Sequence, residues 1–546
     1  MQMTGGEAVV AALKAIGVRH VFGIVSVHNL PIYDAVLRDG TITPIAVRHE
    51  QGAAHAADGY ARATGELGVA IASTGPGTAN TMNGLYEAGF ASSRVLLVTG
   101  QIETRYYGKG KGFLHEAERQ LQMLQSVTRR AESVRRTEDI ADAIFRVATD
   151  INTGRPQPGA VEIPIDLQYA TADVDVPAFT GWPVVQPADD ALNQAAEVLA
   201  GARRPVIWAG GGVNQAGANA ALVALAERLP APVVTTIEGR GAIPEDHDLA
   251  LGATTTARTT GQLIEEADVV LAVGTRFQGS STRNWDLPIA GQLIHLDADP
   301  GVIGRNYRPA VAIVGDARAG LEALAARVTG TSVDLDFVDK ARQARDEARI
   351  RSRELIGADY EAIMDTIRDL LPRDANIVRD ATVPAYLWGD RLLPIYEPRT
   401  SIRPTSAAIG PGLPLALGAA IGSGRRTVLI QGDGGFMLNL GELATAVQYQ
   451  VPLTVCLFND GGYGVLRGIQ ARSFEGRTTG VDLATPDFAT IAQGMGMPGT
   501  PVKSVEEFRD AFKQAADTDG PALLDIDMAA LQPMGGLGAR PQAPRT

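Results

Sequence analysis

The chain is poor in cysteine: of its 546 residues only Cys456 is one, and it lies inside an apolar run. A single cysteine excludes an intrachain disulfide and is typical of proteins in a reducing cytosol. The sequence also has no apolar run of membrane-spanning length and no signal-peptide pattern at its N-terminus, where residues 5–17 predict an ordinary helix. We therefore expect a cytoplasmic protein with no membrane partner.

Excess positive charge is lacking as well. The net charge of −13 argues against an extended basic surface that would bind nucleic acid. The chain has no Gly-x-x-x-x-Gly-Lys-Ser/Thr sequence either, so a diphosphate is not held in the P-loop manner. The content of 45% apolar and 20% charged residues is that of a globular protein.

What the chain does have is a regular alternation of short β-branched runs and amphipathic helices, which predicts an α/β fold with parallel sheets. The length exceeds one hydrophobic core. A Pro-rich stretch (174–190) predicts a linker, the mixed-charge segment 338–355 a solvated helix, and the Gly/Pro-rich tail (532–546) a loose end. We expect three domains, at residues 1–173, 191–330 and 358–530.

Two acidic residues follow neighbouring apolar runs in the third domain. Asp433 stands among Gly432, Gly434 and Gly435 after one run, and Asp460 follows the next. Both side chains should emerge at the carboxyl edge of one sheet, where α/β sheets bind ligands. The glycines let backbone N–H groups approach phosphate oxygens, and two carboxylates with a carbonyl from the turn DGGYG suit Mg²⁺. The alternative is a pair of acids that cap strand ends.

Glu50 is the candidate in the first domain. A strand ends at Val47, and Glu50 opens a helix whose small-residue face contains Ala53, Ala54, Ala57 and Ala61. Taken alone, Glu50 is a helix-start glutamate favoured by the helix dipole.

Together, Glu50 and the run from Gly432-Asp433-Gly434 to Asn459-Asp460 resemble the thiamine-diphosphate-dependent decarboxylase and carboligase family that includes acetolactate synthase, pyruvate decarboxylase and benzaldehyde lyase. The resemblance covers essentially the whole chain and implies three doubly wound domains: pyrimidine-binding, central Rossmann-like and diphosphate-binding. It implies thiamine diphosphate and Mg²⁺, with Asp433, Asp460 and the Gly462 carbonyl as metal ligands. Asparagine is the usual family ligand at position 460, so the aspartate is a departure whose extra charge should tighten metal binding.

The resemblance also implies roles for other residues. Glu50 maps to the activating glutamate that shares a proton with the cofactor's pyrimidine, and we expect burial to raise its pKa. Asn80 is a further pyrimidine-side contact, Ile409 the apolar wedge that bends the cofactor, and Tyr463 a member of the cofactor-binding loop. The active site would lie between the pyrimidine domain of one subunit and the diphosphate domain of another, in a homodimer or homotetramer.

Two histidines lie in predicted loops of the first domain. Lined up with benzaldehyde lyase, His28 coincides with an active-site histidine and His115 with an active-site glutamine. We expect both to be catalytic, steering a substrate carboxylate or donating to the developing alkoxide. The alternative is that they are ordinary surface histidines.

Departures from the family narrow the reaction and the cofactors. Leu466 replaces a glutamate of pyruvate decarboxylases, which favours carboligation over simple aldehyde release. Residues 277–280 are Phe-Gln-Gly-Ser instead of the Phe-Asp-Asp-Arg run with which acetolactate synthases bind FAD, so a bound FAD is doubtful. The turn 209–217 resembles a dinucleotide loop without the full Gly-x-Gly-x-x-Gly spacing, and we interpret it as a domain turn.

The resulting hypothesis is a Mg²⁺- and thiamine-diphosphate-dependent enzyme that makes or breaks a C–C bond next to a carbonyl. Acetolactate-synthase-like ligation of 2-oxo acids is the leading case, with a small 2-oxo acid or aldehyde as substrate. A 2-hydroxyketone or 2-hydroxyacyl-CoA lyase is the alternative within this chemistry. From another class, a nucleotide-dependent oxidoreductase centred on Gly210–Gly212 is an alternative. A further alternative is a catalytically silent regulatory subunit, but the presence of Glu50, Asp433 and Asp460 argues against it.

Overall fold

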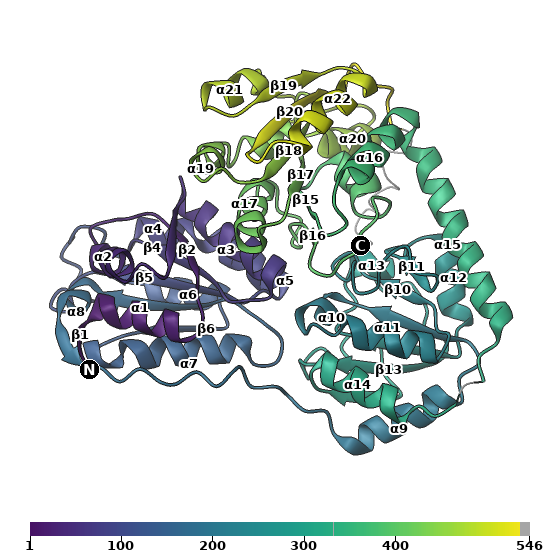
Figure 1. Ribbon diagram of the computed structural model, residues 1–546, viewed down its shortest axis with the longest axis horizontal. Helices are drawn as coiled ribbons and strands as arrows, with labels where there is room; N and C mark the ends of the chain where they lie inside the picture. The colour runs from purple at the N-terminus through teal and green to yellow at the C-terminus, as the bar shows by residue number, and fades with distance from the viewer. Residues whose placement is uncertain (331, 535–546) are drawn as a thin grey trace.

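A computed structural model describes residues 1–330 and 332–534. The chain forms three lobes arranged as a triangle, with the N-terminal lobe on the left, the C-terminal lobe at the top and the middle lobe at the lower right (Figure 1). Each lobe is built on a six-stranded sheet in which every strand pair is parallel. The predicted α/β class with three parallel sheets is confirmed. The expectation for the tail falls largely on residues 535–546, outside the described residues.

The first sheet has the order β3-β2-β4-β5-β7-β6. Its strands are β2 (His20–Gly23), β3 (Thr43–Ala46), β4 (Gly68–Ala72), β5 (Val95–Gln101), β6 (Arg130–Ser133) and β7 (Gly159–Pro164). Its main helices are α1 (Gly5–Ala15), α2 (Leu30–Asp39), α3 (Glu50–Thr64), α5 (Met82–Ala91), α6 (Gln120–Val127) and α7 (Ile140–Asn152). A small antiparallel ribbon of β1 (Gln2–Thr4) and β8 (Thr171–Asp173) lies beside it.

Both faces of this sheet are buried, as expected for a parallel sheet. Along β4, Val69 and Ile71 pack into the core formed with α1, α2 and α7, whereas Ala70 and Ala72 pack into the core formed with α3 and α5. Successive strand residues point to opposite faces, so an unbroken apolar strand serves two helix layers. This arrangement makes the domain doubly wound.

The middle sheet has a different order, β11-β10-β9-β12-β13-β14. Its strands are β9 (Pro205–Ala209), β10 (Val233–Thr235), β11 (Ala250–Gly252), β12 (Val269–Val273), β13 (Gln292–Asp297) and β14 (Val311–Val314). The helices are α9 (Asp189–Ala200), α10 (Gly211–Gln215), α11 (Asn219–Arg228), α12 (Arg258–Glu266), α13 (Gly279–Thr282) and α14 (Ala317–Arg327). This is the order of the dinucleotide-binding Rossmann fold.

The third sheet has the order β16-β15-β17-β18-β20-β19. Its strands are β15 (Asn376–Arg379), β16 (Ser401–Ile402), β17 (Thr427–Gly432), β18 (Leu453–Asn459), β19 (Gly499–Val502) and β20 (Ala522–Asp527). Its helices are α16 (Ala358–Leu370), α17 (Gly412–Ser423), α18 (Asp433–Phe436), α19 (Glu442–Gln448), α20 (Gly464–Ser473), α21 (Phe488–Gly494) and α22 (Val505–Ala516). The sequence pattern predicts one helix over 438–450; instead a short helix begins at Asp433 and a second one only at Glu442.

The connections between the lobes follow the sequence pattern. Residues 174–188 run without helix or strand along the lower edge of the molecule to α9 (Figure 1). The charged segment forms the long helix α15 (Leu335–Ile356), which spans from the middle lobe to the third one.

The first and third lobes of one chain are held together by α3 and α17. The small residues of α3 allow the two helices to cross at backbone contact: Gly59 faces the Leu415 carbonyl, and Gly418 faces the Ala56 carbonyl. A Cβ atom at either glycine would overlap the facing carbonyl oxygen. The buried carboxylate of Glu442, on α19, also accepts the backbone N–H groups of Arg48 and His49 at 3.0 and 3.2 Å. This contact lies just before Glu50.

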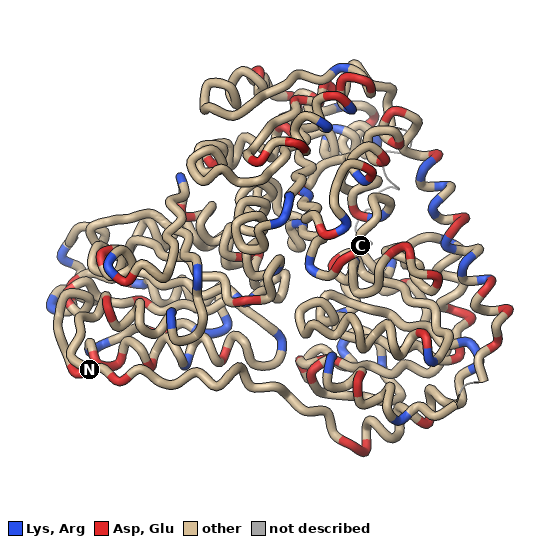
Figure 2. The backbone as a smooth tube through the Cα atoms, viewed as in Figure 1, with Lys and Arg blue, Asp and Glu red and all other residues tan. Residues whose placement is uncertain are grey.

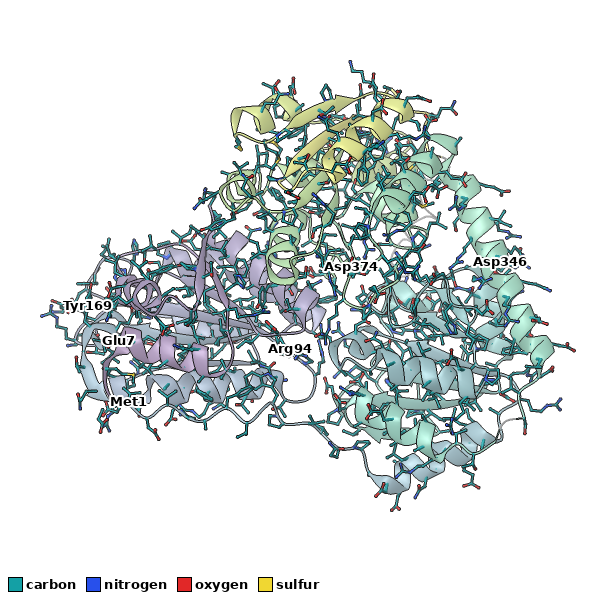
Figure 3. All side chains as sticks on the ribbon, in the orientation of Figure 1. Met1, Glu7, Arg94, Tyr169, Asp346 and Asp374 are labelled. Carbon is teal, nitrogen blue, oxygen red and sulfur yellow. The ribbon has the colours of Figure 1, made fainter. Side chains whose placement is uncertain are left out.

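Charged residues of both signs are interspersed over all three lobes (Figure 2). Side chains project around each lobe, and Arg94 lies at the inner end of the first lobe, toward the middle one (Figure 3). Within residues 1–330 and 332–534, no helix is long and apolar enough to cross a bilayer.

Candidate active site

The two acids of the third domain meet at the carboxyl ends of the paired strands β17 and β18. Asp433 is the first residue of α18, and Asp460 directly follows β18. The backbone N–H of Asp460 donates to Asp433 Oδ1 at 3.4 Å. In the described part of the chain, nothing donates to the buried Asp433 Oδ2. The structure thus brings the two predicted metal ligands together and leaves one buried oxygen for a group outside the chain.

The electrostatics of this acid pair favour a cation. Burial, together with the charge of Asp460, raises the pKa of Asp433 to about 6. Burial raises the pKa of Asp460 as well, and the nearby Arg467 opposes that change. Two neighbouring carboxylates repel each other when both are ionised. A divalent cation between them stabilises the ionised pair.

Glycines line the space around the acids. A Cβ on Gly434 would lie 2.7 Å from the Tyr463 ring and 3.0 Å from the Gly462 carbonyl oxygen. Gly462 itself has φ of 152°, a conformation that side chains disfavour. The Gly462 carbonyl therefore lies beside Gly434, next to Asp433, as a third metal ligand requires. Among the described residues, no three His, Cys, Asp or Glu side chains form a metal cluster, so a metal here would depend on two carboxylates and a carbonyl.

Ile409 stands on the turn before α17, and this turn is tied to the same sheet edge. Asp380, directly after β15, accepts the N–H groups of Gly410 and Gly412, both at 2.9 Å, and the amide of Gln431 at 2.7 Å. The Ile409 side chain remains 38% exposed. Sequence reasoning missed Asp380, because the strand before it, β15, contains Asn376 and Arg379 and only two apolar residues, Ile377 and Val378.

The first domain gathers its candidates at the equivalent edge. Glu50 is the first residue of α3, and its Oε2 accepts a hydrogen bond from Asn80 Nδ2 at 2.9 Å. Asn80 ends the short helix α4 (Pro76–Asn80), and a Cβ on Gly77 would lie 3.2 Å from Glu50 Oε1. Glu50 is only partly buried and Asn80 is exposed in the single chain. The structure therefore pairs these two residues but leaves their outer side open.

His28 and His115 also come together. Their ring centroids lie 5.1 Å apart, and Ser73 Oγ lies 3.4 Å from His115 Nδ1. His28 is buried, and burial, followed by the neighbouring His115, lowers its pKa. His115 has φ of 63°, a left-handed conformation that is uncommon for a residue with a side chain. Strained backbone conformations are often found at functional sites, so the conformation of His115 is consistent with a functional position.

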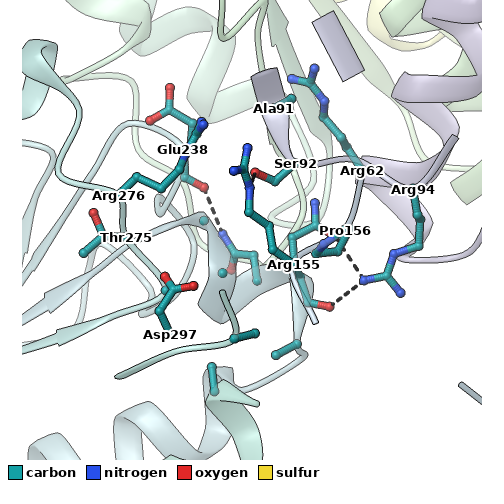
Figure 4. A pocket seen from close by; sticks show the side chains of 18 of the residues that line it. Arg62, Ala91, Ser92, Arg94, Arg155, Pro156, Glu238, Thr275, Arg276 and Asp297 are labelled. Atoms are coloured by element: carbon teal, nitrogen blue, oxygen red, sulfur yellow. Dashed lines mark hydrogen bonds between the residues drawn. The ribbon is translucent and has the colours of Figure 1, made fainter. Parts of the chain in front are cut away.

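A second candidate site lies where the three lobes meet. It is a cavity of about 390 Å³ at the carboxyl ends of β9 and β12, the switch point of the middle sheet. Arg155 and Arg276 line it near Glu238 and Asp297, whereas Arg62 and Arg94 line it from the side of the first lobe (Figure 4). Burial lowers the pKa of Arg94 and of Arg276 to about 10.

The turn 209–217 borders this cavity through Gly211 and Gly212. Guanidinium groups and glycine N–H groups suit a ligand that carries phosphate. The residues between 277 and 280 contribute only Gln278 to the lining, and the described chain has no aspartate there.

Comparison with known proteins adds the family. Three models match the chain in order: the N-terminal TPP binding domain of thiamine pyrophosphate enzymes over residues 3–123, their central domain over 192–324, and their C-terminal TPP binding domain over 384–526.

Relatives match along almost the full chain. A probable acetolactate synthase large subunit of Methanocaldococcus jannaschii is 33% identical over 98% of this chain and 94% of its own length. A probable 2-ketoarginine decarboxylase of Pseudomonas aeruginosa is 36% identical over 96% and 94%. The acetolactate synthase isozyme 2 large subunit of Escherichia coli is 33% identical over 97% and 96%. These matches show that the chain belongs to the thiamine pyrophosphate enzyme family and is a thiamine-diphosphate-dependent enzyme similar to acetolactate synthases. The positions of Asp433, Asp460 and Glu50 are consistent with this family.

Proposed function

We propose that this enzyme is a Mg²⁺-dependent carboligase that joins 2-oxo acids in the manner of an acetolactate synthase. The observation that carries the proposal is the Asp433–Asp460 pair, in which a buried carboxylate oxygen has no donor from the described residues. A buried carboxylate oxygen that lacks a donor is costly, and a divalent cation with diphosphate oxygens would remove that cost.

In this proposal the third domain holds the metal and the diphosphate. Asp433, Asp460 and the Gly462 carbonyl are the metal ligands. The N–H groups of the turn Gly432–Gly435, at the start of α18, would hold the diphosphate, and the Tyr463 ring lies next to Gly434. Ile409, on the turn that Asp380 fixes, would pack against the cofactor as its apolar wedge.

The first domain supplies the proton chemistry. When bound, thiamine diphosphate would supply a nucleophilic C2 carbon that adds to a carbonyl carbon, and its thiazolium ring would accept the electron pair of the C–C bond that then breaks. Because Glu50 Oε2 accepts from Asn80, Oε1 is the oxygen left to hold the proton shared with the cofactor's pyrimidine. His28 and His115 lie on the same edge and can donate to a substrate carboxylate or to a developing alkoxide.

The active site would be completed by a second copy of the chain, in a cytoplasmic homodimer or homotetramer. Both half-sites are open in the single chain, and exposed apolar side chains surround them: Val25, Val27 and Leu114 in the first domain, and Ile409, Met437, Leu438 and Leu466 in the third. Such patches in a soluble domain mark interaction surfaces. We retain domain boundaries at 1–173, 191–330 and 358–530 as part of this proposal.

Two other reactions remain testable on the same site. The His28–His115 pair supports a lyase acting on 2-hydroxyketones or 2-hydroxyacyl-CoA, since imidazoles can assist alkoxide formation in either direction. The relative named as a 2-ketoarginine decarboxylase makes decarboxylation of a basic 2-oxo acid a second candidate. Family membership favours all three over a nucleotide-dependent oxidoreductase at Gly210–Gly212.

The deciding experiment is product analysis of the purified enzyme with added thiamine diphosphate and Mg²⁺. Pyruvate, benzoylformate, benzaldehyde and 2-ketoarginine are each supplied alone, and pyruvate is also paired with a second 2-oxo acid. We expect a 2-hydroxy-2-alkyl-3-oxo acid from 2-oxo acids. Aldehyde release from 2-ketoarginine as the only product would overturn carboligation in favour of decarboxylation.

The same preparation tests the expectation of no FAD. We expect a colourless protein after purification. A stoichiometric flavin absorbance spectrum would show that the cavity between the lobes holds the cofactor that the residues at 277–280 speak against.

A further inference from the structure

Arg467 lies beside Asp460, the position at which the family resemblance implies an asparagine. It is on the first turn of α20, and its Nη1 lies 3.3 Å from Asp460 Oδ2 and 3.3 Å from the Asp460 carbonyl oxygen. The pair is partly buried, with side-chain exposures of 29% for Arg467 and 23% for Asp460. An ion pair in such a place is screened less than one at the surface.

The guanidinium is held from several directions. Its Nε donates to Asp482 Oδ1 at 2.7 Å, and its Nη2 donates to the carbonyl of Gly461 at 3.1 Å and to that of Val481 at 3.5 Å. Arginine's planar fork of donors suits such a fixed position, because one ordered side chain makes several bonds. Arg467 therefore has a set position next to Asp460.

Two glycines make room for the contact between Asp460 and Arg467. A Cβ on Gly464 would overlap Asp460 Oδ2, and a Cβ on Gly462 would lie 2.9 Å from Arg467 Nη2. Without side chains at these positions, the carboxylate turns back over the start of α20 toward the guanidinium.

The contacts also join the metal loop to a distant segment. Tyr463 N donates to the Val481 carbonyl at 2.8 Å and Leu483 N to the Gly461 carbonyl at 2.9 Å, and Arg467 bridges the same two segments through Asp482. Gly462, whose carbonyl lies beside Asp433, is at the centre of this arrangement.

We propose that Arg467 is a positioning residue that makes aspartate usable at position 460, so that the Asp460–Arg467 pair replaces a neutral asparagine ligand. An asparagine brings no net charge to a site that must accept a diphosphate, whereas an aspartate alone brings one negative charge that repels it. The guanidinium cancels that charge and directs one carboxylate oxygen away from the metal. This inference rests on the proposed metal and diphosphate site.

The test is a double-mutant cycle of Arg467→Gln, Asp460→Asn and both together. The readouts are the dissociation constant of thiamine diphosphate at saturating Mg²⁺, measured by calorimetry, and the thermal midpoint of the protein without metal or cofactor. Arg472→Gln, an exposed arginine at the other end of α20, is the matched control.

We expect Arg467→Gln to weaken cofactor binding by roughly 10-fold or more, the effect of about 1.4 kcal/mol. Adding Asp460→Asn should restore most of that affinity, because removing the aspartate removes the charge that Arg467 balances. In the protein without cofactor, Arg467→Gln should lower the midpoint more when residue 460 is aspartate than when it is asparagine. Arg472→Gln should leave both readouts unchanged.

Additive effects of the two substitutions on cofactor affinity would overturn the proposal while leaving the metal site intact. A wild-type protein that binds no thiamine diphosphate with Mg²⁺ would overturn the proposed function itself, and this inference with it. The two failures are distinguishable because the first occurs with a wild-type protein that binds normally.

Discussion

The first and third lobes have the same sheet topology. If the strands of each are numbered from its first parallel strand, both have the order 2-1-3-4-6-5, whereas the middle sheet has the order 3-2-1-4-5-6. In both of the matching lobes the switch point lies between the first and third strands, which is where such sheets bind ligands. The shared topology therefore gives two equivalent edges in one chain.

The residues at the two edges differ completely. In the third lobe, Asp380 and Asp433 follow the strands at the switch point, and Asp460 follows the next one. In the first lobe, the equivalent loops carry His28, Ser73 and His115, and Glu50 follows the edge strand. One edge is suited to a cation and phosphate, the other to proton transfer. Topology decides where a ligand lies, and side chains decide which part of it each edge receives.

Among these tests of the difference between the two edges, we expect Asp433→Ala to have the largest effect. Without the buried carboxylate, the third lobe would lose its main proposed metal ligand, so we expect loss of Mg²⁺-dependent retention of thiamine diphosphate. The measurement is the cofactor content of the purified variant after gel filtration with Mg²⁺. The thermal midpoint without cofactor controls for folding. A variant that copurifies with a full complement of cofactor would remove Asp433 from the metal site.

Glu50→Gln tests the other edge. Glutamine keeps a hydrogen-bond acceptor for Asn80 but cannot hold or release the shared proton. We expect normal cofactor binding and a rate of C2–H/D exchange of the bound cofactor that is lower by roughly 10²–10⁴-fold. Exchange at the wild-type rate would mean that the first lobe contributes no acid–base group through Glu50.

His28→Ala and His115→Ala sharpen the account of the same edge. We expect unchanged cofactor binding and a kcat that is lower by roughly 10–10³-fold, as for a lost donor to an oxyanion. Because burial and His115 lower the pKa of His28, its neutral form persists below the ordinary imidazole pKa of about 6.5. Activity that needs neutral His28 should fall as the pH drops through this lowered pKa.

Steady-state pH profiles give the measurement for the two histidines. The acid limb should be lost or shifted in His28→Ala. A variant that raises KM alone identifies a contact to the substrate carboxylate instead of a transition-state donor. If both variants match wild type in kcat, KM and pH profile, the histidines have no part in the reaction.

Gly418→Ala has the smallest expected effect and concerns the contact between the two lobes. A Cβ at this position would overlap the Ala56 carbonyl, so α17 must move away from α3. We expect a loss of stability of about 1–3 kcal/mol, as for overpacking elsewhere. Thermal unfolding measures it, with Gly494→Ala as control because that position faces open space. Equal midpoints for the two variants would show that the crossing does not constrain the lobes.

The sequence predicted the fold because apolar runs of strand length alternate with amphipathic helices along nearly the whole chain. It identified Asp433 and Asp460 because both come at the ends of such runs, and in the structure the Asp460 backbone N–H donates to Asp433 Oδ1. The family resemblance made Asn80 a further pyrimidine-side contact, but it did not predict the hydrogen bond that Asn80 donates to Glu50.

Other features could not be found from sequence. Arg467 meets Asp460 because Gly462 and Gly464 leave room and because Asp482, which comes 15 residues later, turns back toward it. The cavity between the lobes is lined by segments from all three lobes, and no local sequence pattern encodes their proximity. Helix α19 begins at Glu442, later than the expected start at residue 438, because residues 437–441 form turns between α18 and α19.

The central claim is that the first lobe of one chain and the third lobe of another form one active site. It is tested most directly by co-expressing Glu50→Gln and Asp433→Ala chains with different affinity tags and purifying the hybrid through both tags. In a shared site, one of the two sites of the hybrid dimer has no substitution, so we predict about half of the wild-type activity from two nearly inactive parents. A hybrid as inactive as its parents would contradict the account.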